Sequence, residues 1–65
     1  MKTVIVAGDG NLSIAENLTE MQAWLAERNI AARELTMLHI LNFQVVFRAT
    51  FEDEHKADQF AVQFS

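Results

Sequence analysis

Every second residue from Phe43 to Phe51 is apolar, and the residues between them are polar except Val46. This pattern constrains the fold more than any other. The apolar positions of the alternation are Phe43, Val45, Phe47, Ala49 and Phe51. A period of two sustained over this length predicts a β-strand whose successive side chains point to opposite faces. Because three phenylalanines share one face, that face must be buried against other parts of the chain.

Residues 13–28 carry the pattern of an amphipathic helix. Ser13 and Glu16 match the capping box, in which the serine hydroxyl and the glutamate carboxylate each accept a backbone N–H at the helix start. An apolar stripe follows at helical spacing: Ile14, Leu18, Met21 and Leu25. Asn29 can adopt the left-handed conformation that ends many helices.

Two shorter elements lie at the ends of the sequence. The β-branched run Val4–Ala7 leads into Gly8–Asn11, which predicts a short strand followed by a tight turn. The carboxylates of residues 52–54 suit a helix N-terminus. Apolar residues then recur at helical spacing: Ala57, Phe60, Ala61 and Phe64. We therefore expect a second helix over residues 53–63.

The segment 31–41 is ambiguous between helix and strand. Its composition favours a helix by intrinsic propensity, but such a helix would be apolar almost all round. As a strand, Leu35, Met37, His39 and Leu41 would share one face, and Leu38 and Ile40 the other. We favour a strand over residues 33–41, joined to the next one by a tight turn at Asn42.

The order strand, helix, strand, strand, helix predicts a single α+β domain over residues 1–65. A right-handed crossover makes the strands at 4–7 and 33–41 parallel, and the strand at 43–51 fits antiparallel between them. The expected fold is a three-stranded sheet with both helices on one face, a ferredoxin-like fold lacking its last strand. The alternative, with a helix at 31–41, leaves a two-stranded sheet among three helices.

The open face of this sheet is expected to be unusually apolar. Four apolar residues are expected on that face, and together they would form an exposed patch of the kind that marks an interface. These residues are Ile5, Leu38, Ile40 and Val46. The strand at 4–7 also has an exposed edge, which pairs readily. The alternative is that the strand at 33–41 is short or curled, so that Leu38 and Ile40 cover their own core. Trp24 and Arg28, at the edge of the helix's buried stripe, are of the types that dominate binding interfaces.

Composition and motifs argue against several function classes. Nine acidic residues against five basic ones give a net charge of −4, which disfavours direct binding of nucleic acid. There is no cysteine for a thiolate metal site, and the only histidines, His39 and His55, lack a metal-ligand spacing. No nucleophile motif is visible, so we expect no enzyme activity, no cofactor and no metal. No apolar run is long enough for a signal peptide or a membrane span, which predicts a cytoplasmic chain without membrane contact.

The turn and first helix also carry a family resemblance. Asp9-Gly10-Asn11-Leu12, the stripe positions Ile14, Leu18 and Leu25, and the closing run of residues 27–30 resemble the start of an ACT domain. The resemblance implies a ferredoxin-like domain that pairs through its sheets. It also implies an amino-acid ligand near Asp9, Gly10 and Asn11.

The sequence thus leaves two functions open. The first is a small non-enzymatic interaction module, accessory, regulatory or inhibitory, that docks an apolar sheet face and the acidic rim at residues 52–54 on a protein partner or a second copy. The alternative is an ACT-like dimer that senses a small amino-acid ligand.

Overall fold

The computed structural model describes residues 1–41 and 44–64 and shows an α+β fold. In chain order the elements are β1 (Lys2–Ala7), α1 (Ile14–Glu27), β2 (Glu34–Leu41), β3 (Gln44–Phe51) and α2 (Glu54–Gln63). The predicted order is confirmed, and the ambiguous segment is a strand. The predicted turn residue Asn42 and the first residue of the alternation, Phe43, lie outside the described residues.

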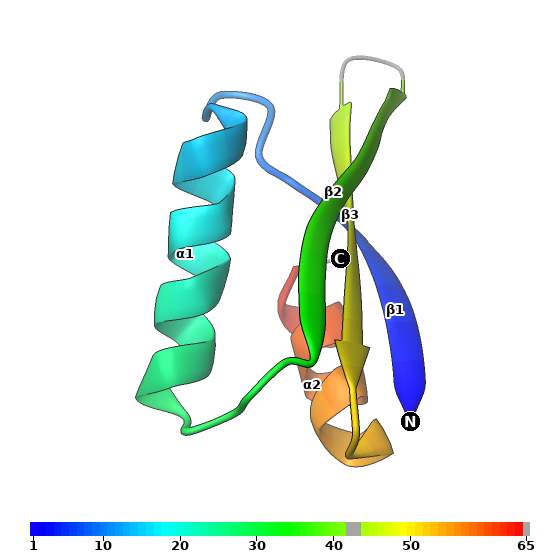
Figure 1. Cartoon of the computed structure of the whole chain (residues 1–65). Helices are drawn as coiled ribbons and strands as arrows, with labels where there is room; N and C mark the ends of the chain where they lie inside the picture. The colour runs from blue at the N-terminus through cyan, green and yellow to red at the C-terminus, as the bar shows by residue number, and fades with distance from the viewer. Residues whose placement is uncertain (42–43, 65) are drawn as a thin grey trace.

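Within the described residues the three strands form one sheet in the order β1-β3-β2. β3 pairs antiparallel with both neighbours, so β1 and β2 run parallel on either side of it. Figure 1 shows α1 and α2 on the same side of the sheet, with α2 behind β3 and the outer side of β1 uncovered. This arrangement fits the ferredoxin-like topology expected from the sequence.

Both helices begin with the caps that their sequences suggest. The Ser13 hydroxyl accepts the Glu16 N–H at 3.1 Å, and the Glu16 carboxylate accepts the Ser13 N–H at 3.0 Å, which completes the capping box. Asp53 caps α2 by accepting the N–H groups of His55 and Lys56. Past the end of α1, Asn29 takes the left-handed conformation with a φ of 55°.

The phenylalanine ladder of β3 forms the centre of the core. Phe47, Ala49 and Phe51 are at most 1% exposed, and Phe60 from α2 is fully buried beside them. The other buried apolar residues are Val4, Val6, Met21, Leu25, Ile30 and Ala57. Apart from the alanines, each of these side chains stabilises the fold by about 1.5–3 kcal/mol when fully buried. The burial predicted from the alternation is confirmed for the described part of the strand.

An irregularity in β2 changes which side chains share a face. The pairs Met37–Phe47 and His39–Val46 are separated by one extra residue in β2, Leu38, which is a β-bulge. Beyond the bulge, Ile40 pairs with Val45 and therefore lies on the helix side of the sheet. The predicted placement of Ile40 on the open face is wrong, because an inserted residue reverses the alternation that follows it.

A buried asparagine holds the connection between β1 and α1. Asn17 is 3% exposed, and its Oδ1 accepts the Asp9 N–H at 2.7 Å. Its Nδ2 donates to the carbonyls of Asp9 and Ser13, both at 3.1 Å. Gly8 fits closely beneath it: a Cβ at this position would lie 2.7 Å from Phe47 and 3.0 Å from Asn17. The turn is thus fastened to both the helix and the sheet.

Candidate interaction surfaces

The open face of the sheet is mostly polar. Cross-strand pairing places its side chains in three rows, Thr3–Thr50–Glu34, Ile5–Arg48–Thr36 and Ala7–Val46–His39. Within the first row Thr3 contacts Thr50 at 2.9 Å, and Arg48 of the second row contacts Glu34 of the first at 3.0 Å. Of the predicted interface residues, Ile5 and Val46 are placed on this face by strand pairing, whereas Ile40 is not. The expected apolar patch on the open face is therefore wrong in its inclusion of Ile40.

Exposed apolar side chains gather instead along β2. Met37, Leu38 and Ile40 are 41%, 40% and 63% exposed, and we call these three residues the β2 apolar cluster. The bulge contributes to the cluster because it places Met37 and Ile40 on the same face of β2, opposite Phe47 and Val45. The cluster lies near the end of β2 that leads to β3, the end drawn uppermost in Figure 1. Two predicted interface residues, Leu38 and Ile40, are brought together here.

Trp24 lies between the two helices. Its ring meets Phe60 and Phe64 edge-on, each with a centroid distance of 5.8 Å, and Arg28 stacks over the ring at 4.2 Å. Such aromatic pairs add about 0.5–1.5 kcal/mol beyond the area they bury. Trp24 therefore joins α1 to α2. The helical pattern placed it at the edge of α1 but could not show that α2 would cover it.

The outer side of this helix pair is hollowed. A shallow depression of about 530 Å³ is lined by Trp24, Arg28, His55, Asp58, Gln59 and Val62. The indole Nε1 of Trp24 is buried, and the described residues provide it with no hydrogen-bond acceptor. An open depression with one unpartnered indole N–H does not specify a ligand.

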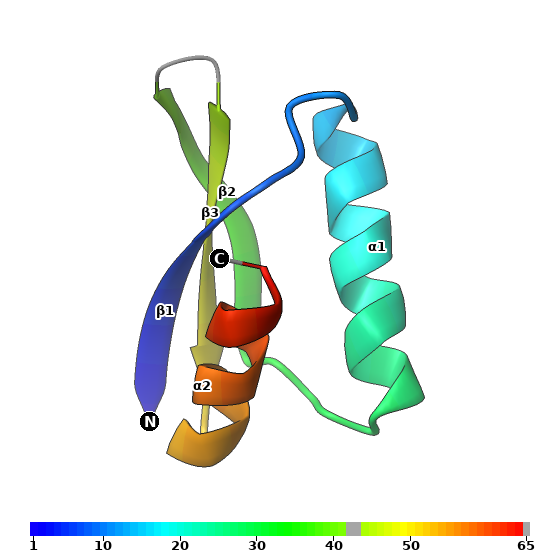
Figure 2. The same ribbon diagram turned by 180° about the vertical axis from the view of Figure 1, so that it is seen from behind.

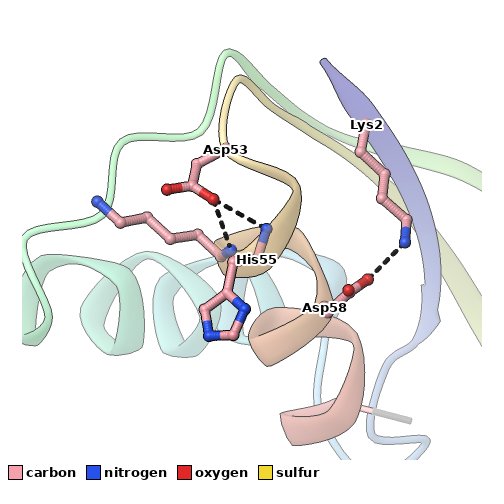
Figure 3. Close-up of polar contacts among 5 residues, drawn as sticks. Lys2, Asp53, His55 and Asp58 are labelled. Atoms are coloured by element: carbon pink, nitrogen blue, oxygen red, sulfur yellow. Dashed lines mark hydrogen bonds and ion pairs between the residues drawn. The ribbon is translucent and has the colours of Figure 1, made fainter.

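The acidic rim lies at the far end of the molecule from the β2 apolar cluster. Glu52 is paired with Arg33, and Asp53 is used in the cap of α2. Figure 3 shows this cap and, beside it, Lys2 of β1 reaching Asp58 of α2 at 2.6 Å. The hydrogen bond and the charge of Asp58 raise the pKa of Lys2 above its usual value of 10.5. In the described residues the acidic rim is therefore engaged in local pairs and lies apart from the β2 apolar cluster.

The turn after β1 is built from its own hydrogen bonds. Asp9, Gly10 and Asn11 are exposed, and the Asp9 carboxylate accepts the Asn11 N–H at 2.8 Å. This contact is an Asx turn, which uses the carboxylate oxygen locally. Binding of an amino acid at this turn stays a prediction.

The two histidines lie apart. His39 is on the open face beside Val46, and His55 is in the first turn of α2. Among residues 1–41 and 44–64, no group of three or more histidine, cysteine or acidic side chains could hold a metal ion. Over the same residues, no helix has the length and apolar character needed to cross a membrane.

Comparison of the chain with family models, with curated protein sequences and with solved structures finds no significant match.

Proposed function

We propose that this protein is a non-enzymatic interaction module that docks on a partner protein through the β2 apolar cluster. The observation that carries the proposal is the exposure of Met37, Leu38 and Ile40 within four consecutive positions of one edge strand. A single exposed apolar side chain is ordinary, but several in one place are typical of a binding surface.

The chemistry of the β2 apolar cluster indicates the kind of partner. Methionine has a flexible, polarizable side chain that adapts to irregular apolar surfaces. The cluster contains no charged residue, so the partner surface that fits it is an apolar groove. The net charge of −4 favours a partner whose surface around that groove is basic, because complementary charge speeds encounter.

A matched pair of variants tests the proposal. Ile40→Asp places a charge within the cluster, whereas Thr36→Asp places the same charge on the same strand but on the polar open face. Circular dichroism first establishes that both variants fold. We expect immobilised wild type and Thr36→Asp to retain the same proteins from a lysate of the source cells, and Ile40→Asp to lose them. Equal retention by Ile40→Asp contradicts the proposal.

A further inference from the structure

The second surface lies at the opposite edge of the sheet, along β1. Gly8 donates its N–H to the Val45 carbonyl at 2.7 Å, which identifies Gly8–Val45 as a hydrogen-bonded pair of the β1–β3 ladder. Such pairs alternate along an antiparallel ladder. The backbone groups of Thr3, Ile5 and Ala7 therefore point away from β3, toward the outer edge. No described element pairs with them there.

This edge lacks the features that usually prevent strands from associating. Edge strands are commonly protected by proline, by a bulge or by a charged side chain near the middle. β1 contains no proline, and its pairing with β3 runs without a shift from Lys2–Phe51 to Ala7–Val46. Its one charged residue, Lys2, is at the end of the strand and is held by Asp58. β2, the other edge, has a bulge.

We propose that β1 pairs antiparallel with β1 of a second copy of this chain, with Ile5 opposite Ile5 at the two-fold axis. In this register Thr3 of each copy faces Ala7 of the other, so all three outward residues form hydrogen-bonded pairs. A shift of two residues in either direction leaves one outward residue of each β1 without a partner in the other β1. The side chains of Thr3, Ile5 and Ala7 lie on the open face. The two open faces therefore join into one, with all four helices behind a six-stranded sheet.

Charge complementarity favours a second copy in this orientation. β1 begins with the basic Lys2 and is followed, after Gly8, by the acidic Asp9. Antiparallel pairing about Ile5 brings Lys2 of each copy beside the Gly8–Asp9 step of the other, whereas parallel pairing would align like charges. Figure 2 shows α2 beside the Lys2 half of β1, so the two α2 helices lie toward opposite ends of the paired strands. Ile5, 54% exposed in one chain, is covered by its counterpart.

Sedimentation equilibrium and native mass spectrometry over a range of concentrations test the association. We expect wild type to reach twice the 7.4 kDa mass of one chain as its concentration rises. Ile5→Lys should remain monomeric, because it places two ammonium groups at the axis. Thr36→Lys is the matched control. Thr36 of β2 and Ile5 of β1 both pair with Arg48, on its two sides, so each substitution places a lysine beside the same arginine. The control should dimerise like wild type.

Cysteine cross-linking tests the register in a chain that has no cysteine of its own. Residues of a hydrogen-bonded pair have Cα atoms about 5.5 Å apart, within the range that a disulfide spans. Under mild oxidation, Ile5→Cys should cross-link rapidly, while Thr3→Cys and Thr36→Cys should form little intermolecular disulfide. A wild-type chain that stays monomeric at every concentration overturns the proposal, and so does cross-linking of Ile5→Cys no faster than of Thr36→Cys. Because Ile40 and Ile5 lie on opposite edge strands, these results are independent of partner binding at the β2 apolar cluster.

Discussion

Replacing Asn17 by alanine tests the idea that one buried amide fastens the turn between β1 and α1. The substitution removes the acceptor of the Asp9 N–H, at 2.7 Å, and a donor to the Asp9 carbonyl, at 3.1 Å. The Ser13 carbonyl keeps the Asn17 backbone N–H as a partner at 3.0 Å. The Asp9 carbonyl likewise keeps the Leu12 N–H as a partner at 3.1 Å, so the group that loses its partner is the Asp9 N–H. A polar group left without a partner costs about 1–3 kcal/mol, and we expect Asn17→Ala to lose about that much stability.

That loss is large for a chain of this length. At about 0.05–0.15 kcal/mol per residue, 65 residues give a free energy of unfolding of roughly 3–10 kcal/mol. Urea titration followed by the fluorescence of Trp24, the only tryptophan, measures the change. Gln22→Ala, an exposed amide on the same helix, is the control and should alter stability by less than about 0.5 kcal/mol.

Hydrogen exchange supplies a local measurement for the same variant. The Asp9 N–H should exchange faster in Asn17→Ala than in wild type, by more than global destabilisation explains, because its acceptor is gone. If Asn17→Ala is as stable as Gln22→Ala, or if the exchange of Asp9 is unchanged, then Asn17 does not hold the turn.

Two further predictions concern the helices. Trp24→Ala removes the ring that contacts Phe60 and Phe64, and this side chain is half-buried. We expect the free energy of unfolding, measured by chemical unfolding followed by circular dichroism, to fall by about 2–4 kcal/mol. A decrease no larger than that of Gln59→Ala, at an exposed position of α2, would refute the packing role of Trp24. The hydrogen bond from the Ser13 N–H, with a smaller contribution from its hydroxyl, lowers the pKa of Glu16 below 4.5. A lowered native pKa means that the contribution of Glu16 to stability is complete above pH 4.5 and is lost as the pH falls through the native value. The unfolding free energy of Glu16→Gln should therefore vary less with pH in that acidic range than that of wild type, and identical pH profiles would argue against the capping box.

The elements of this fold were predictable where the signal is local. The capping box of Ser13 and Glu16, the left-handed Asn29 and the alternation of β3 each depend on residues close in sequence, and the structure confirms each of them for the described residues. The order β1-β3-β2 followed from the handedness of the crossover and the shortness of the hairpin connection.

The candidate sites were less predictable, because they depend on contacts between elements distant in sequence. The helical pattern of α1 gave the angular position of Trp24, but only the packing of α2 decides that Phe60 and Phe64 cover it. Asn17 was not anticipated, since a polar residue beside the apolar stripe is buried only when a turn folds back over it. The sequence signal for its burial was its position in the first turns of the helix, next to the glycine-containing loop that precedes the helix.

Outside the ambiguous segment 31–41, the sequence by itself determined which segments are helices and strands and which strand carries the buried face, because hydrophobic period and capping are properties of neighbouring residues. Only the tertiary structure decided which apolar residues remain exposed. Ile40 and His39 exchange faces because β2 must pair with β3 across the extra residue Leu38, and a single inserted residue reverses every face beyond it. The surface available to a partner is therefore set by strand pairing rather than by the hydrophobic pattern alone.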